Sequence, residues 1–390
     1  MHIGLDGLPL TAPKTGVGHY TFELARALAC IEPASQFEIV YPSSFPAISL
    51  AEPNGAPLPA NLKLDRERVG PLGRHWWSVG LPRYVSRSKL ELFHGTNYDI
   101  PLWRRCATVV TIHDLSQLLH SETHEKRSVK RAQRRLPHMA RAADAIITPT
   151  ESVRRDVCEV LKVSPDKVFA IPEAARACFR PLTFAETADA RNSFGIGDDF
   201  LLTVGTIEPR KNLSVLVNTF ADVARARPQG NIQLVIAGGR GWLSGPLFEA
   251  IAKSPARDRI LLTDYLHDDD LRALYSSCRA FIYPSIHEGF GLPPLEAMAC
   301  GAPVIASRIP ALEETTGGAA LLFDPKSAAE LVQKILELLE NENAQRELSA
   351  AGRRRAAEFS WEKTARLTWS VYEEALRRFQ NVGAGASPPS

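Results

Sequence analysis

Two series of short apolar segments, each alternating with longer segments of helical period, constrain the fold of this 390-residue chain more than any other feature. The first series lies at residues 2–5, 37–40, 92–93, 108–112, 145–149 and 168–171. The second begins with FLLTVG at 200–205 and continues with QLVIAG, ILLTD, AFIYPS, APVIAS and AALLF. Short apolar strands that alternate with helices are typical of parallel sheets with crossover helices. The sequence therefore predicts an α/β protein with two doubly wound, Rossmann-like domains.

The chain length agrees with two domains, because a single hydrophobic core stops growing near roughly 250 to 300 residues. A polar stretch, TFAETADARNSFGIGDD, separates the two series and marks the boundary. We expect an N-terminal domain over 1–180 and a C-terminal domain over 198–361. The last helical segment, at about 362–380, is expected to return to the N-terminal domain, and the tail 381–390 to be disordered.

Composition excludes several classes of protein. The chain is 45% hydrophobic and 23% charged, which is ordinary for a globular protein. Its six cysteines lie far apart without a CxxC pair, so they predict neither a zinc site nor a disulfide framework and fit a reducing compartment. The sequence shows no signal-like start and no run of about 18 apolar residues, so we expect a cytoplasmic protein without a membrane-spanning segment.

A basic segment at 126–141 stands out against a net charge of only +2. Its cations recur at helical spacing: Lys126, Arg127, Lys130, Arg131, Arg134, Arg135 and Arg141. Such a segment is either a solvated helix face or a surface for anionic lipid headgroups or a phosphate-bearing acceptor. The second interpretation predicts a peripheral location at the inner face of the membrane. We expect no nucleic-acid partner.

The most informative motif is SIHEGFGLPPLEAMACGAPVIAS, which follows the strand predicted at AFIYP. Gly289 and Gly291 let the backbone approach a ligand closely, and Pro293 and Pro294 suit the first turn of a helix. The amides that open this helix predict an anion site, because they lack helical acceptors and lie at the positive end of the helix dipole. The expected donors are Phe290, Gly291 and Leu292.

Two glutamates flank the predicted anion site. A carboxylate in contact with a phosphate would repel it, so Glu288 and Glu296 are expected to accept hydrogen bonds from neutral hydroxyl groups on either side. A nucleotide sugar offers all three partners, since its diphosphate lies between a hexose ring and a ribose.

Charged residues also follow the first strand of the second series. The segment GTIEPRKNL places Arg210 and Lys211 at the carboxyl edge of the second sheet, where doubly wound folds bind ligands. Two adjacent cations would stabilise a diphosphate as it leaves. The run Asp268 to Asp270 precedes the helical pattern LRALYSS and predicts N-capping and first-turn charge. With no DxD motif at a strand end, we predict no metal ion.

In the first series, His113 and Asp114 follow the strand predicted at 108–112. His94 is interpreted as a satisfied structural residue, as lone histidines usually are. The loop TAPKTGVGHYTFEL holds Gly16 and Gly18 but lacks the GxGxxG pattern with a later acidic residue, so a dinucleotide cofactor is poorly supported and no cofactor is expected.

As a whole the chain resembles the family 4 retaining glycosyltransferases, whose two Rossmann-like domains face each other across a cleft in the GT-B architecture. Their signature, two glutamates separated by seven residues, is matched by Glu288 and Glu296. The likeness extends through GTIEPRKNL, IAGG, GFGLPPLEAMACGAPVIAS and LLFDP.

The resemblance implies a role for each motif. Glu288 would meet the donor sugar, the amides of 290–292 the sugar and phosphate, and Glu296 the ribose. His113 would lie beside the donor sugar, with Asp114 orienting its ring. The glycine loop would lie under the donor phosphates, and the nucleobase would be held by the backbone of Asp264, Tyr265 and Leu266.

Two departures from the family pattern bear on these roles. Many relatives have arginine where this chain has Thr206, so Lys211 is expected to matter more than Arg210. The segment IPEAARACFRP replaces a common asparagine-glycine turn, and the sequence assigns no role to Glu173.

The resemblance is strongest to bacterial polysaccharide-assembly mannosyltransferases. It implies retaining, metal-independent transfer of a hexosyl group, with mannose from GDP-mannose favoured, to a glycan or lipid-linked acceptor. Two alternatives stay open: a nucleotide-sugar epimerase or glycoside phosphorylase on the same architecture, and a non-catalytic protein that binds sugar nucleotides. The donor base, the acceptor and the oligomeric state are left undetermined.

Overall fold

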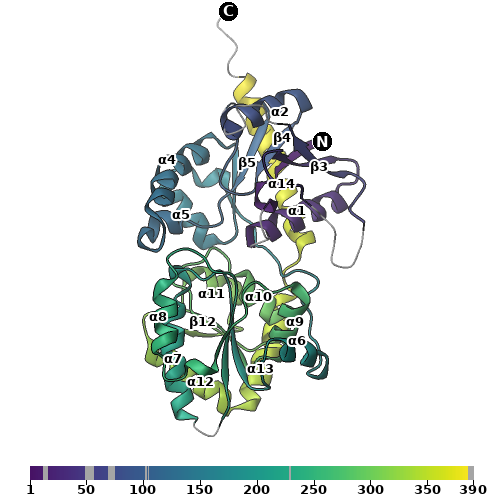
Figure 1. Ribbon diagram of the computed structural model, residues 1–390. Coiled ribbons are helices and arrows are strands. Elements are labelled where there is room, and N and C mark those ends of the chain that lie inside the picture. The colour runs from purple at the N-terminus through teal and green to yellow at the C-terminus, as the bar shows by residue number, and fades with distance from the viewer. Residues whose placement is uncertain are drawn as a thin grey trace, which may run out of the picture. The chain divides into compact units, whose positions relative to one another are not determined.

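The computed structural model describes residues 1–11, 16–48, 57–68, 75–101, 103, 105–227 and 230–384, which form two compact units (Figure 1). The first unit comprises Met1–Leu115, Arg131–Glu173 and Ser360–Ser390. The second comprises Ser116–Lys130 and Ala174–Phe359. Each unit contains one parallel sheet covered by helices, so the predicted fold of two doubly wound domains is confirmed.

The first unit has a seven-stranded sheet in the order β3-β2-β1-β4-β5-β6-β7, with parallel neighbours throughout. The strands are β1 (His2–Asp6), β2 (Gln36–Pro42), β3 (Leu62–Glu67), β4 (Leu92–Gly95), β5 (Ala107–Thr111), β6 (Ala145–Thr148) and β7 (Val168–Ala170). Only β3 was not predicted. Its sequence LKLDRE is largely polar because it lies at the sheet edge, where most of its side chains are only partly buried.

Five longer helices accompany this sheet: α1 (Gly16–Ile31), α2 (Leu81–Ser88), α4 (Lys126–Ala142), α5 (Glu151–Leu161) and α14 (Trp361–Ala384). Helix α14 contacts α1, β5 and β6, so the C-terminal helix returns to the first unit as expected (Figure 1). It extends to Ala384, which makes 381–384 of the expected disordered tail helical. Residues 385–390 lie outside the described part of the chain.

Short helical turns complete this half of the chain. They are η1 (Leu8–Leu10), η3 (Trp76–Gly80), α3 (Ser116–Leu119), η4 (Ser121–Thr123) and η5 (Pro165–Lys167). Of these, α3 and η4 belong to the second unit, and α4 begins in the second unit and continues in the first.

The second unit has a six-stranded parallel sheet in the order β10-β9-β8-β11-β12-β13. The strands are β8 (Phe200–Val204), β9 (Gln233–Ala237), β10 (Ile260–Leu262), β11 (Ala280–Tyr283), β12 (Val304–Ser307) and β13 (Leu321–Phe323). All six were predicted. Neighbouring residues of β8 face opposite sides of the sheet: Leu202 packs in one hydrophobic cluster and Leu201 in another. The sheet is therefore buried on both faces.

The helices of the second unit are α6 (Ala188–Ser193), α7 (Leu213–Ala226), α8 (Gly245–Lys253), α9 (Asp268–Ser277), α10 (Leu292–Ala299), α11 (Pro310–Thr316), α12 (Ala328–Glu340) and α13 (Glu342–Ala356). Short turns occur at η6 (Ala185–Thr187), η7 (Pro209–Lys211) and η8 (Arg257–Arg259). The aspartates at 268–270 form the first turn of α9, and His267 is the N-cap residue. The predicted first-turn charge is confirmed. The predicted N-capping role was wrong, because His267, which precedes the aspartates, has the extended backbone of an N-cap residue.

The strand order locates the place where each unit is suited to bind a ligand. In the second sheet the order reverses between β8 and β11, and in the first between β1 and β4. Loops that leave the carboxyl ends of such a pair run in opposite directions and leave a crevice between them. The GTIEPRKNL segment follows β8, and the segment with Glu288 follows β11, so the two strongest motifs meet at one switch point.

Candidate functional site

Glycine backbones form one wall of the switch point in the second unit. Gly205 follows β8 at φ +148°, and Gly238 follows β9 at φ +145°. A Cβ atom on Gly238 would lie 2.1 Å from the carbonyl oxygen of Gly205, so only glycine permits this close approach. The two loops continue to pair beyond their strands, with Ile207 donating its amide hydrogen to the carbonyl of Gly239 at 3.0 Å. This pairing fixes the start of η7, which carries Arg210 and Lys211.

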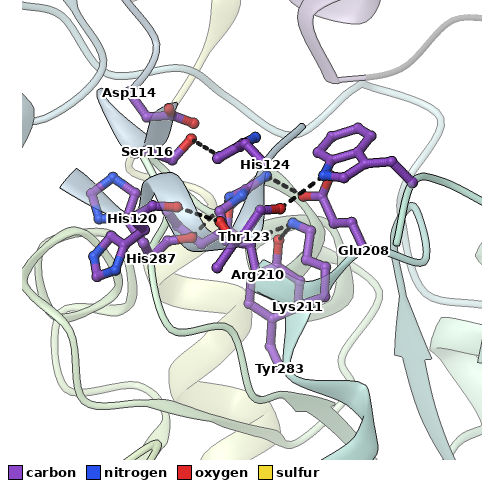
Figure 2. Close-up of polar contacts among 12 residues, drawn as sticks. Asp114, Ser116, His120, Thr123, His124, Glu208, Arg210, Lys211, Tyr283 and His287 are labelled. Atoms are coloured by element: carbon purple, nitrogen blue, oxygen red, sulfur yellow. Dashed lines mark hydrogen bonds and ion pairs between the residues drawn. The ribbon is translucent and has the colours of Figure 1, made fainter. Parts of the chain in front are cut away.

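Lys211 and Glu288 form a buried ion pair. Lys211 Nζ lies 2.6 Å from Glu288 Oε1 and also 2.6 Å from the hydroxyl of Tyr283, the last residue of β11 (Figure 2). Both charged side chains are only about a tenth exposed, at 11% and 9%. The two motifs identified in the sequence are thus in direct contact.

Arg210 binds the other oxygen of the same carboxylate. Its Nη1 lies 2.9 Å from Glu288 Oε2 and 2.8 Å from the carbonyl oxygen of His287, while its Nη2 lies 2.6 Å from Glu208 Oε1. Sequence analysis did not select Glu208. In the sequence, Glu208 could have been recognised only as a charged residue in the loop after β8, directly before Pro209, Arg210 and Lys211.

The charges in this cluster shift one another's protonation. Burial alone would raise the pKa of Glu288, but the positive charges of Arg210 and Lys211 outweigh it and hold the pKa well below its usual range. Burial lowers the pKa of Lys211, and Glu288 partly offsets this effect. Burial also raises the pKa of Glu208, and the negative charge of Glu288 adds to the rise. Glu288 is therefore a firmly ionised anchor for two cations.

The predicted anion site lies in the loop after β11. Gly291 is the N-cap residue of α10 at φ +100°, a backbone conformation that favours glycine, and a Cβ atom there would also lie 2.5 Å from Leu312 Cδ2. Among the described residues, no group accepts a hydrogen bond from the amides of Phe290, Gly291 or Leu292. Thr315 fixes the loop by donating its hydroxyl hydrogen to the carbonyl of Phe290 at 2.6 Å. Three amide donors at a helix N-terminus are thus available to an anion.

Glu296 lies in α10 and is held by a cation that sequence analysis missed. Arg176 Nε is 3.0 Å from Glu296 Oε1, and its Nη1 is 2.6 Å from Asp268 Oδ2 at the start of α9. The side chain of Arg176 is 7% exposed. Tyr265, in the segment expected to hold a nucleobase, is half-exposed. Its burial and the negative charges of Asp268 and Glu296 raise its pKa, and the positive charge of Arg176 opposes the rise.

The rest of the predicted nucleobase segment lies at the same end of the sheet. Asp264 has a φ of +53°, and its carbonyl oxygen accepts a hydrogen bond from the amide of Gly238 at 2.8 Å. Leu266 is buried in the core cluster that also contains Leu295 of α10. Packing therefore fixes this loop beside the helix that carries Glu296.

A segment from the N-terminal half of the chain, Ser116–Lys130, is part of the second unit. Trp242, after β9, donates its indole hydrogen to the carbonyl oxygen of Thr123 at 2.9 Å and stacks on the ring of His124, with ring centroids 5.6 Å apart. The ring of His120 lies 4.9 Å from that of His287, the residue before Glu288 (Figure 2). Sequence analysis did not identify these contacts, because they join residues more than a hundred positions apart.

In the first unit, His113 follows β5 and is bound on both ring nitrogens. Its Nε2 donates to the carbonyl oxygen of Thr96 at 2.9 Å, and its Nδ1 lies 3.2 Å from Glu173 Oε1. Burial lowers the pKa of His113, but Glu173 more than compensates, and the net shift is upward. The expectation that Asp114 orients the ring was wrong, because the two ring nitrogens contact Thr96 and Glu173, which follows β7. This contact gives Glu173 a role.

His94 is a structural residue, as interpreted. It is fully buried, with Nδ1 2.8 Å from the hydroxyl of Tyr372 and Nε2 2.8 Å from the hydroxyl of Thr111. Burial lowers its pKa to about 3, so it is neutral. Gly16 and Gly18 lie in the first turn of α1, and the loop before them, 12–15, is outside the described residues.

Each half of the chain matches a protein-family model. The family model described as Glycosyltransferase Family 4 matches residues 14–175, and the model described as Glycosyl transferases group 1 matches residues 186–355. The chain is 29% identical over 374 residues to the O-antigen chain mannosyltransferase B of Escherichia coli, a match that covers 94% of this chain and 97% of that protein. The chain belongs to the family 4 glycosyltransferases.

Other relatives of this glycosyltransferase agree in fold or in part of the sequence. The serotype-specific mannosyltransferase WbdA of Escherichia coli is 32% identical over 304 residues, which cover 75% of this chain but only 37% of WbdA. Among solved structures, sucrose-phosphate synthase from Thermosynechococcus elongatus is 22% identical with a TM-score of 0.74, covering 99% of this chain and 100% of that one. Anabaena HepE, solved with UDP and glucose, is 16% identical with a TM-score of 0.73, covering 95% and 99%. These neighbours have the GT-B fold.

Proposed function

We propose that this glycosyltransferase transfers a mannosyl group from GDP-mannose, with retention of configuration, to a glycan or lipid-linked acceptor in the synthesis of a cell-surface polysaccharide or glycolipid. The observation that carries the proposal is the cluster of Lys211, Arg210 and Glu288 beside the available amides of 290–292. Mannose is favoured because several relatives are named as mannosyltransferases.

In the proposed complex, the donor diphosphate binds the amides of 290–292 and the side chains of Lys211 and Arg210. Negative charge grows on the diphosphate as the glycosidic bond breaks, and preorganised donors in a buried site stabilise that charge most effectively. Glu288 accepts hydrogen bonds from hydroxyls of the transferring sugar. Glu296, held by Arg176, accepts from the ribose.

Retention is proposed from the state of Glu288. Both of its oxygens are bound by cations, which lowers its basicity and makes it unsuited to act as a general base. We therefore favour attack of the acceptor hydroxyl on the face from which the diphosphate leaves. The leaving phosphate oxygen then accepts the proton of the acceptor hydroxyl.

Metal independence is also proposed. Two side-chain cations and a helix N-terminus would neutralise the diphosphate, which is the task that a divalent metal performs in other nucleotide-sugar enzymes. No cofactor is required by this chemistry.

A panel of nucleotide sugars tests the proposal. At 100 times its dissociation constant, a ligand stabilises the folded protein by about 2.7 kcal/mol, which a thermal shift detects readily. We expect GDP-mannose to stabilise more than UDP-glucose, the nucleotide class bound by HepE. Proton NMR of the product should then show the donor's anomeric configuration. Inversion at the anomeric carbon would contradict retention, epimerised donor would favour the epimerase, and binding without turnover on any acceptor would favour the non-catalytic alternative.

Peripheral contact with the inner face of the membrane is proposed for α4. Lys126, Arg127, Lys130 and Arg134 are exposed on this helix. Arg135 is instead bound to Asp99 at 2.5 Å, four residues before Trp103, whose side chain is 73% exposed. Exposed cations suit an anionic membrane surface, and an exposed tryptophan suits the membrane–water interface. Across the described ranges, no helix has the length and apolarity needed to cross a bilayer.

Charge reversal of Arg127, Lys130 and Arg134 to glutamate tests this surface. Each cation is worth about 1 kcal/mol near an anionic membrane, so binding to anionic vesicles should fall by more than roughly 100-fold. The matched control reverses three exposed cations of the second unit: Arg225, Lys253 and Arg257. Equal loss in both variants, or no vesicle binding by the unaltered protein at low salt, would leave α4 as a solvated helix face.

A further inference from the structure

Glu208 is a buried carboxylate that the mechanism above does not use. It is the N-cap residue of η7, with φ −142° and ψ 157°, but its side chain makes no capping hydrogen bond. Instead Glu208 Oε1 lies 2.6 Å from Arg210 Nη2, and its side chain is only 3% exposed. The Glu208 side chain therefore does not cap the turn that it begins. Its hydrogen-bonded contact with Arg210 suggests a functional role instead.

Arg210 is shared by two carboxylates. One of its terminal nitrogens contacts Glu288 at 2.9 Å and the other contacts Glu208 at 2.6 Å, while Lys211 contacts Glu288 at 2.6 Å. Two carboxylates and two cations together carry no net charge. The cluster is thus balanced before any anion reaches it.

A diphosphate changes that balance. It attracts Arg210 and Lys211 toward its own oxygens and adds negative charge to a site already occupied by two buried carboxylates. A buried carboxylate that loses its cation is strongly disfavoured and gains a proton instead. Binding of a diphosphate should therefore be accompanied by protonation within the cluster.

The contacts indicate which carboxylate gains the proton. Glu288 has a cation on each oxygen, so its negative charge stays paired with one cation when the other moves to the diphosphate. Glu208 has one cation partner, Arg210, and the other charged groups near it are Lys211 and Glu288. Tyr283, bound to Lys211, is neutral because burial raises its pKa well above the usual value. The same difference appears in the pKa directions, since the pKa of Glu208 is raised and that of Glu288 is lowered.

We propose that Glu208 is a positioning residue that holds Arg210 in the free enzyme and takes up a proton from solvent when the donor diphosphate binds. The proposal rests on the proposed function only in assuming that a nucleoside diphosphate group occupies this site. The proton goes to the Glu208 carboxylate and returns to solvent when the product nucleotide leaves. Donor binding then weakens as the pH rises, because the proton becomes harder to take up. Protonation of Glu208 weakens its hold on Arg210, which becomes free to bind the diphosphate.

Isothermal titration calorimetry with GDP and with UDP, in buffers of different ionisation enthalpy, measures the protons taken up on binding. For the wild-type protein we expect net uptake, with affinity falling by up to about tenfold per pH unit while a whole proton is exchanged. In Glu208→Gln the amide keeps an acceptor for Arg210 but cannot be protonated, so the uptake should disappear. Asp222→Asn, which removes an exposed carboxylate paired with Arg225, is the matched control and should behave like the wild type.

The nucleotide's own phosphate also titrates, so the difference between wild type and Glu208→Gln is the decisive quantity. Arg210→Met provides a second variant: without its cation, Glu208 is protonated before the nucleotide arrives, and uptake should again be lost. Glu208→Gln should also lower KM for the donor at high pH more than it changes kcat, a split that general loss of structure would not produce.

Equal proton uptake in the wild type and in Glu208→Gln would overturn the proposal, as would affinity of the wild type that does not depend on pH beyond the phosphate titration. Failure of every nucleoside diphosphate to bind the wild type would instead contradict the proposed function. If Glu208→Gln does not fold, the comparison of the wild type with Arg210→Met decides in the same way.

Discussion

Replacement of Glu288 by glutamine should affect stability, nucleotide binding and turnover in different directions. The carboxylate neutralises two cations at 2.6 and 2.9 Å, and its side chain is 9% exposed. Glutamine retains the shape and one acceptor oxygen but removes the charge. Arg210 then keeps Glu208 as its carboxylate partner and the carbonyl oxygen of His287, while Lys211 keeps the neutral hydroxyl of Tyr283 but loses its carboxylate partner.

The magnitude follows from the loss of one partner in a buried ion pair, which typically costs 3 to 5 kcal/mol. Because glutamine still accepts a hydrogen bond, we expect about 3 kcal/mol, or a fall in melting temperature of roughly 6 to 12 °C for a domain of this size. A nucleoside diphosphate supplies the missing negative charge, so it should stabilise Glu288→Gln by more than it stabilises the wild type. Turnover loses the sugar contact and should fall by roughly 10- to 150-fold, as for one hydrogen bond to a charged group.

Thermal denaturation with and without GDP, together with steady-state kinetics, measures all three effects. Glu249→Gln is the control, because its carboxylate is 74% exposed and lies 3.8 Å from Lys253, so its loss should change stability by less than about 1 kcal/mol. The reasoning is refuted if the melting temperature of Glu288→Gln equals that of the control, or if GDP affinity and turnover fall by the same factor.

Three further predictions concern neighbouring groups. Glu296→Ala should weaken GDP binding by about 1 to 3 kcal/mol in calorimetry, because donor and product share the ribose contact, and unchanged GDP affinity would remove Glu296 from that role. Activity should persist in EDTA, and activity that EDTA abolishes and magnesium or manganese restores would contradict metal independence. Glu173→Gln should destabilise the protein most below about pH 6.5, the ordinary pKa of histidine, because the raised pKa of His113 stabilises the folded state there. The difference from wild type in denaturant unfolding should shrink as the pH rises through the folded pKa of His113, and a difference that grows with pH would exclude this pairing.

The sequence predicted the parts of the fold that depend on a few neighbouring residues. Strands β8 to β13 are short apolar runs bounded by glycine, proline or polar residues, and that pattern is local. Strand β3 was not predicted because an edge strand buries few of its side chains, so its sequence need not be apolar. Glycine at 291 has a local reason too, since a positive φ at the start of α10 favours it, whereas the close approach of Leu312 does not follow from the neighbouring sequence.

The partners of charged residues could not be predicted in the same way. The sequence assigned no role to Glu173, because its partner His113 is 60 positions away. It did not identify Arg176, because Glu296 lies 120 positions away. Asp114, the neighbour in sequence, was selected in place of Glu173. Adjacency in sequence is a poor guide here, because alternate residues at a strand end point in different directions.

The sequence by itself therefore determined the two doubly wound sheets, the loops that follow β8 and β11, and the presence of Arg210, Lys211, Glu288 and Glu296 in those loops. Periodicity, glycine and proline specify such features within a few residues. Only the tertiary structure decided that Arg210 is divided between Glu208 and Glu288, which lies 78 positions further along the chain. That contact exists because β8 and β11 are neighbours in the sheet, and burial at the switch point makes every charge there depend on the charges that the strand order brings beside it.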